Sequence, residues 1–179
     1  MPPISHDMLW LLASGAMIIV AVWSDVRTMR IPNWCVLSGA FSALLIASMP
    51  GGLGLADALI GGAVGLALLL PLYIFRILGA GDVKLIAALG MFTGMPGIFG
   101  LTLATFASGG VLSLLWMIRH RQSANVLSNL RTGLLHGVMD ASAGKLPSAQ
   151  NFPVSQSRMP YACAIAAGMV LYVLLSKRF

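Results

Sequence analysis

Few residues in this chain could do chemistry, and the carboxylates are the most informative of them. The chain has five carboxylate side chains, all of them aspartates, and no glutamate. They are Asp7, Asp25, Asp57, Asp82 and Asp140. Two carboxylates held close together cannot both ionise easily, so one keeps its proton while the other can accept one. A reaction that needs a carboxylate pair must therefore draw it from these five.

Asp25 and Asp82 have the surroundings of such a pair. Asp25 comes directly after an apolar run, in SDVRTMRIPN, and Asp82 lies in GAGDVK between two further apolar runs. The ionised partner could activate water while the protonated partner donates to a scissile carbonyl, which is general acid–base hydrolysis without metal or cofactor. Gly79 and Gly81 would let the backbone beside Asp82 bend tightly and admit an extended substrate.

Plainer roles stay open for each of these residues. An aspartate at a helix end often caps or anchors the helix, and Asp25 could simply pair with an arginine that follows it. Asn33 could cap the next helix, which we favour, or hydrogen-bond the substrate. Lys84 could hold the charged form of Asp82 or bind lipid phosphate.

The composition indicates that a membrane surrounds these residues. The chain is 58% hydrophobic and 9% charged, whereas about 25% of residues are charged in a typical soluble domain. The net charge of +6 comes from basic residues between long apolar runs, so nucleic acid is not needed to explain it. Cys35 and Cys163 are far apart and form no CxxC motif, which argues against a disulfide framework or a metal site.

Six apolar runs predict an all-α integral membrane protein with about six transmembrane helices. The predicted spans cover residues 8–24, 34–49, 56–78, 83–96, 97–118 and 161–175. Pro and Gly place the turn between the fourth and fifth spans at Met95-Pro96-Gly97. The first span is expected to be retained, because no basic residue precedes it and no small-x-small cleavage site follows.

The basic residues alternate between loops, which predicts an outer N-terminus and three cytoplasmic loops. Asp25 and Asp82 then lie at cytoplasmic span ends. Lys177 and Arg178 fall on the outer side in this scheme, but the other nine basic residues outweigh them. Within residues 119–160, apolar residues at helical spacing predict an amphipathic helix, on the membrane surface or packed on the spans. One domain, 1–179, is expected.

Three functions remain open at this point. Besides a hydrolase, the chain could be a small transporter or channel subunit with the two aspartates as a proton or cation relay. Such a relay would more naturally place its carboxylates near the bilayer centre. A non-enzymatic assembly factor of a secretion machine is the third possibility, and it would tolerate loss of either aspartate.

Three strings, in order along the chain, closely resemble the type IV prepilin peptidase family, which has a GxGD active-site motif. The first is Asp25 with the IPN string that follows, the second is GAGDVKLIAALG around Asp82, and the third is PYACAIAAG from Pro160. The resemblance extends from the first predicted helix to the last. It implies a membrane aspartyl endopeptidase whose catalytic aspartates are Asp25 and Asp82.

The resemblance also implies a substrate and a location. Such enzymes cut the leader from prepilins on the cytoplasmic side of the bacterial inner membrane, and the short form is similar to peptidases of tight-adherence (Flp) pilus systems. A Flp-type pilin or pseudopilin and membrane lipid are the expected partners. Longer members carry a region with paired CxxC motifs and methylate the new N-terminus, so methyl transfer is not expected here. The expected residues that bind substrate or shape the site are Gly79, Gly81, Lys84 and Asn33.

Overall fold

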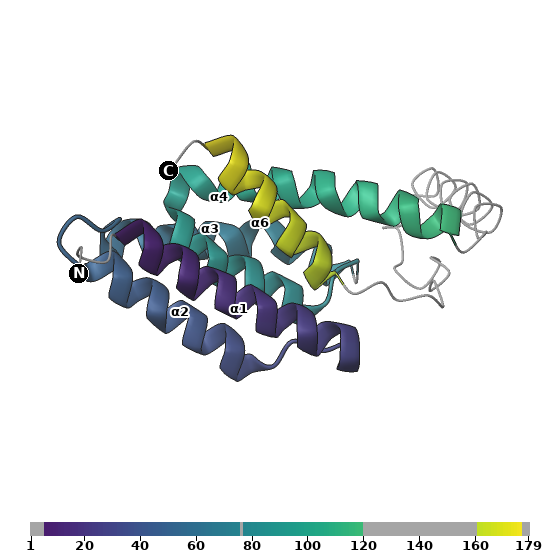
Figure 1. Ribbon diagram of the computed structural model, residues 1–179, viewed down its shortest axis with the longest axis horizontal. Helices are drawn as coiled ribbons and strands as arrows, with labels where there is room; N and C mark the ends of the chain where they lie inside the picture. Colours follow the sequence, from purple (N-terminus) through teal and green to yellow (C-terminus); the bar gives the residue numbers. More distant parts are fainter. Residues whose placement is uncertain (1–5, 76, 120–160, 177–179) are drawn as a thin grey trace, which may run out of the picture. The chain divides into compact units, whose positions relative to one another are not determined.

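The computed structural model describes residues 6–75, 77–119 and 161–176, and regular structure among them is helical (Figure 1). The helices are α1 (His6–Thr28), α2 (Asn33–Ser48), α3 (Leu55–Ile74), α4 (Ala80–Arg119) and α6 (Ala162–Ser176). The chain divides into two compact units, and the first comprises the described residues up to Gly110 together with α6. The remaining described residues, 111–119, continue α4 into the second unit. The predicted amphipathic helix within 119–160 lies outside the described residues.

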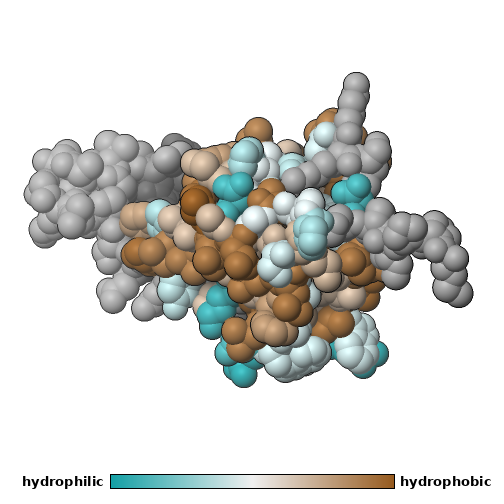
Figure 2. Space-filling view, turned by 90° about the vertical axis from the view of Figure 1, so that its left-hand side faces the viewer, coloured by the Kyte–Doolittle hydropathy of each residue, from teal (hydrophilic) through white to brown (hydrophobic). Residues whose placement is uncertain are grey.

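Several of these helices are long and apolar enough to cross a membrane. They cover residues 7–28, 55–74 and 80–115, while α2 and α6 are shorter apolar helices. Large apolar side chains such as Ile19 and Leu37 are exposed, and apolar residues form extensive brown patches on the face in Figure 2. Exposed apolar surface on this scale fits lipid as the surrounding solvent. The all-helical membrane class is confirmed, whereas the number of six spans stays a prediction.

In the first unit, α1 lies between α2 and α6 (Figure 1). The contact of α1 with α2 is close because Gly39 has no side chain, and a Cβ there would collide with the Met17 sulfur. Between α3 and α4 the backbones themselves meet. A Cβ at Gly61 or at Gly90 would collide with the backbone of the other residue. Small residues at such contacts are how apolar helices approach closely in a membrane.

The interruption predicted at Met95-Pro96-Gly97 lies at Gly94 instead. This residue has φ 72° and ψ −179°, so α4 consists of two helical stretches, and only glycine adopts this backbone conformation readily. Pro96 has no N–H to donate to the Phe92 carbonyl four residues earlier. The Trp10 indole N–H donates to that carbonyl over 2.6 Å, so α1 stabilises the interruption.

Three helix boundaries differ from the prediction, and two of them lie beside the aspartates. The helix α1 continues to Thr28, so Asp25 lies within its last turn rather than after it. The helix α4 begins at Ala80, so Asp82 lies in its first turn. The helix α3 ends at Ile74 rather than at residue 78, because the chain turns where the Ile77 and Leu78 N–H groups both donate to the Leu72 carbonyl.

Candidate active site

The turn that follows Asp25 is held by local hydrogen bonds. Met29 has φ 52°, a left-handed conformation that ends α1. The Ser24 hydroxyl donates to the Arg30 carbonyl over 2.8 Å, and the Thr28 hydroxyl donates to the Ser24 carbonyl over 2.9 Å. These bonds fix the path of the chain from α1 to the IPN string.

The Asp25 carboxylate is buried, with 7% of the residue exposed. Its Oδ2 accepts a hydrogen bond from the backbone N–H of Ala162, 3.0 Å away at the start of α6. Arg27, one of the arginines that could have paired with it, instead lies over the Trp23 ring, 4.3 Å from its centroid. The interaction partner of Asp25 therefore comes from the far end of the chain.

Asp82 contributes to the start of its own helix. Its Oδ2 accepts the Gly79 N–H over 3.2 Å, and the Gly79 carbonyl accepts the Val83 N–H. A side chain in the first turn that reaches back to the N-cap N–H forms one half of a capping box. Asp82 thus has a structural role in addition to any chemical one, and asparagine could fill that structural role through its amide oxygen.

The IPN string and the GAGDVK string are in direct contact. A Cβ at Gly81 would lie 3.1 Å from the Ile31 Cβ, so glycine lets the two segments approach. The Lys84 ammonium donates to the Asn33 Oδ1 over 3.0 Å. Asn33 does not cap α2, because Pro32 is the N-cap and no side chain caps the helix. The cap that we favoured for Asn33 is wrong, and its amide joins the two strings instead.

The two carboxylates lie in each other's electrostatic field. The half-buried Tyr161 also lies in the electrostatic field of Asp82. Residues from α1, α4 and the start of α6 therefore meet at one place. We call this region the aspartate end, defined by Asp25, Ile31–Asn33, Gly79–Lys84 and Tyr161–Ala162.

Sequence reasoning did not assign Tyr161 or Ala162 to the site. Both lie in the PYACAIAAG string, which was used only as a mark of resemblance. The position of that string after a long loop gave no reason to place it beside Asp25. The residue type also could not single out the Ala162 backbone N–H as a donor, because every residue except proline has a backbone N–H.

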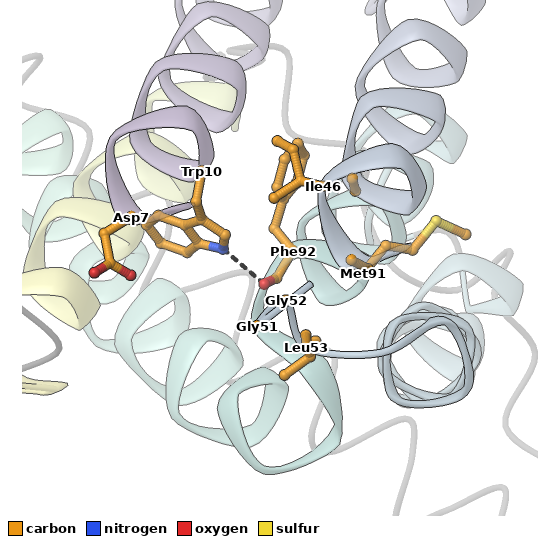
Figure 3. A pocket seen from close by; sticks show the side chains of 10 residues that line it. Asp7, Trp10, Ile46, Gly51, Gly52, Leu53, Met91 and Phe92 are labelled. Carbon is orange, nitrogen blue, oxygen red and sulfur yellow. Dashed lines mark hydrogen bonds between the residues drawn. The ribbon is translucent and has the colours of Figure 1, made fainter. Parts of the chain in front are cut away.

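A cavity of about 390 Å³ lies elsewhere in the first unit. Its lining includes Asp7, Trp10, Ile46, Leu53, Met91 and Phe92, and Figure 3 shows the Trp10 indole directed at the Phe92 carbonyl. Trp10, which lines the cavity, lies about 22 Å from Asp25 along the axis of α1, because an α-helix rises 1.5 Å per residue. Among the described residues that line the cavity, Asp7 is the only aspartate, so these residues do not supply a carboxylate pair. In the described part of the chain, no three His, Cys, Asp or Glu residues are grouped as metal ligands.

Comparison with known proteins points to one family. A model of the type IV leader peptidase family matches residues 12–114, a range that includes Asp25 and Asp82. A prepilin leader peptidase/N-methyltransferase from Pectobacterium carotovorum subsp. carotovorum is 31% identical over 141 residues, which are 70% of this chain and 50% of that protein. The chain thus spans about half the length of this curated relative. No solved structure matches the chain significantly.

Proposed function

Because this chain belongs to the type IV leader peptidase family, we propose that it is a membrane aspartyl endopeptidase that removes the leader of a prepilin. Asp25 and Asp82 are its catalytic pair. The observation that carries this proposal is the direct contact between the string after Asp25 and the string around Asp82, with Asp25 itself buried at the same end. The name of the relative, a prepilin leader peptidase, supports the substrate class.

The reaction needs one charged and one protonated carboxyl group. The charged carboxylate takes a proton from water, and the water oxygen bonds to the scissile carbonyl carbon. The protonated carboxyl group gives its proton to the carbonyl oxygen as that bond forms. When the intermediate collapses, the C–N bond breaks, the amine takes the proton that came from water, and the hydroxyl proton returns to the second carboxylate. The products are a carboxylic acid and an amine, and the pair is regenerated.

Glycines beside Asp82 support access for an extended peptide. Gly79 lies where a Cβ would come within 3.1 Å of the Asp82 Oδ2, so a side chain there would crowd the carboxylate. Gly81 lets Ile31 pack against the backbone next to Asp82. In this proposal Asn33 and Lys84 shape the site by holding the two strings together.

The topology is a further part of the proposal. We place the chain in the bacterial inner membrane with six spans and the aspartate end in the cytoplasm, and Flp-type prepilins as substrates. The basic residues near this end, Arg27, Arg30 and Lys84, support that orientation. In a background without native cysteines, an impermeant thiol reagent on intact cells should label Gly52→Cys but not Lys145→Cys. Labelling in the reverse pattern would refute this orientation.

The proposal covers peptide cleavage and not the methyl transfer that appears in the relative's name. The 179 residues contain two cysteines and no CxxC pair. Cleavage by this chain with S-adenosylmethionine present should leave an unmodified N-terminal amine on the product. A mass gain of one methyl group on that amine would contradict this part of the proposal.

A proton or cation relay is the main competing function. Relay carboxylates are expected near the bilayer centre, whereas Asp25 is in the last turn of α1 and Asp82 in the first turn of α4. Helix ends suit a peptidase whose substrate is cut at the membrane surface. A relay protein or an assembly factor would cleave no peptide.

The test is cleavage of candidate prepilins by the purified full chain in lipid, read by product mass. Asp25→Asn and Asp82→Asn should each abolish cleavage and leave the protein folded, because asparagine keeps the shape and the hydrogen-bond acceptor of the side chain. Asp57→Asn is the matched control, since Asp57 is exposed in the first turn of α3. EDTA should not change the rate, because two carboxylates suffice. Cleavage by either active-site variant near the wild-type rate would overturn the catalytic assignment.

A further inference from the structure

The amino end of α6 lies against both aspartates. The Ala162 N–H donates to the Asp25 Oδ2 over 3.0 Å, in a buried hydrogen bond. The neighbouring residue, Tyr161, is half-buried and lies in the field of Asp82. The start of one helix therefore contacts one carboxylate and acts on the other.

The position of Ala162 in α6 explains why its N–H can donate to the Asp25 carboxylate. The Tyr161 carbonyl accepts the N–H groups of Ala164 and Ile165, over 2.9 and 3.1 Å, so Tyr161 caps α6. Ala162 is then the first helical residue, and the first N–H groups of a helix have no partner within it. The bond to Asp25 therefore replaces no hydrogen bond within α6.

The position of Asp25 makes such a donor important. Burial penalises a charged carboxylate, and the carboxyl-terminal end of α1, where Asp25 lies, carries a partial negative charge. The amino end of a helix has the opposite polarity, and an N–H donated to a carboxylate favours its charged form. The start of α6 therefore opposes both of the effects that disfavour charge on Asp25.

Close contacts hold α6 in position against α4. The Ser108 hydroxyl donates to the Ala164 carbonyl over 2.8 Å. A Cβ at Gly109 would lie 3.4 Å from the Tyr161 hydroxyl, which places that ring against the α4 backbone. With these contacts on both sides of Ala162 in the sequence, the N–H is held in a fixed direction.

The two aspartates differ in how they receive their donors. Asp82 accepts the N–H of Gly79, three residues away in its own helix start, over 3.2 Å in an exposed position. Asp25 accepts its donor from a separate helix in a buried position. The charge of Asp25 acts on Asp82 of α4 and on Cys163 of α6, and the charge of Asp82 acts on Tyr161.

We propose that the amino end of α6 is a positioning element of this active site, in which the Ala162 N–H orients the Asp25 carboxylate and favours its charged form. Asp25 is then the partner that takes a proton from water, and Asp82 is the partner that carries the proton. This inference rests on the proposed function, because it assigns roles within the proposed pair.

The experiment compares Ala162→Pro with Ala162→Val in the full chain. Proline removes the N–H and is tolerated at the first helical position, while valine adds similar bulk and keeps the N–H. The proline variant should have a kcat roughly tenfold or more below that of the valine variant, as for loss of one fixed donor. The acid limb of its rate profile should move to higher pH, because the charged form of Asp25 has lost its donor.

A backbone ester provides a second variant in case the proline variant does not fold. Replacing Ala162 by lactate through suppression of a stop codon removes the N–H and changes little else. The same fall in kcat and the same pH shift are expected relative to alanine introduced at the stop codon in the same way. A purely structural role would lower the yield or the unfolding temperature and leave the acid limb in place, and that result would overturn the inference.

Two further outcomes separate this inference from the proposed function. If wild type cleaves prepilin and Asp25→Asn does not, the proposed function holds. Equal kcat and equal pH profiles for the proline and valine variants would then refute the role of Ala162 alone. If wild type cleaves no prepilin, the proposed function fails, and the inference fails with it.

Discussion

The two ends of the first unit are built in different ways. At the aspartate end, hydrogen bonds between polar groups join segments that are distant in sequence, namely Lys84 with Asn33 and Ala162 with Asp25. The other end contains the interruption of α4 at Gly94, and we call it the interruption end, defined by Trp10, Leu53, Phe92 and Gly94. There, close packing and one indole N–H hold the helices together.

Because of this difference, substitutions at the two ends should have different effects. In the proposed function the carboxylates at the aspartate end carry the chemistry, so changes there should affect rates more than stability. The interruption end leaves little space, because a Cβ at Gly94 would lie 2.7 Å from the Leu53 Cδ2. Changes there should lower stability and leave the kcat of the folded molecules intact.

The largest expected effect is at the aspartate end. Each single change, Asp25→Asn or Asp82→Asn, should lower kcat by roughly 10²- to 10⁴-fold, the usual contribution of a general acid or base. The double variant should be little slower than either single variant, because residues that act as a unit are not additive. Single-turnover cleavage of prepilin measures all three rates. Losses that multiply in the double variant would mean that the two carboxylates act independently.

The next effect is on stability at the interruption end. Gly94→Ala places a side chain at φ 72°, which should cost about 1–3 kcal/mol of the free energy of unfolding. Gly15→Ala is the matched control, since a Cβ there meets nothing within 4 Å. Thermal unfolding in detergent gives the stability, and kcat per folded molecule should stay near wild type. A Gly94→Ala protein as stable as Gly15→Ala would show that the conformation at Gly94 is not needed.

A smaller effect on stability should follow from removing the indole N–H. Trp10→Phe leaves the buried Phe92 carbonyl without this donor. The free energy of unfolding should fall by about 1–3 kcal/mol, and by the lower figure if the phenyl ring fills the space of the indole. Trp23→Phe is the matched control, because Trp23 is exposed and its ring contact with Arg27 can persist. If both variants unfold at the same temperature, the Trp10 bond does not stabilise the interruption.

The sequence predicted the features that depend on residue type and local spacing. Apolar runs predicted the helices to within a few residues, and the Met95-Pro96-Gly97 string predicted an interruption one to three residues after the observed one at Gly94. The sequence also singled out Asp25 and Asp82, which lie in one electrostatic field. As a catalytic pair they stay a prediction.

The features that the sequence missed depend on tertiary contacts. Asn33 was expected to cap α2, yet its amide oxygen accepts a hydrogen bond from Lys84 on another helix. The Ala162 backbone N–H could not be linked to Asp25, because backbone donors leave no mark in a sequence. Helix boundaries near the aspartates also differed, since local hydrogen bonds around Met29 and Leu72 decide where those helices end.

The smallest effect should come from the link between the two strings of the aspartate end. Asn33 and Lys84 are exposed, so their coupling in a double-mutant cycle of alanine variants should be about 0.5–1 kcal/mol. If this link holds Asp82 in place, the same coupling should appear in kcat as roughly a two- to fivefold effect. Asn33→Ala with Ser48→Ala, at the opposite end of α2, is the control cycle and should be additive. Additivity of Asn33→Ala and Lys84→Ala in both unfolding and cleavage would mean that the hydrogen bond contributes nothing, and the contact of Ile31 with Gly81 would then be what joins the strings.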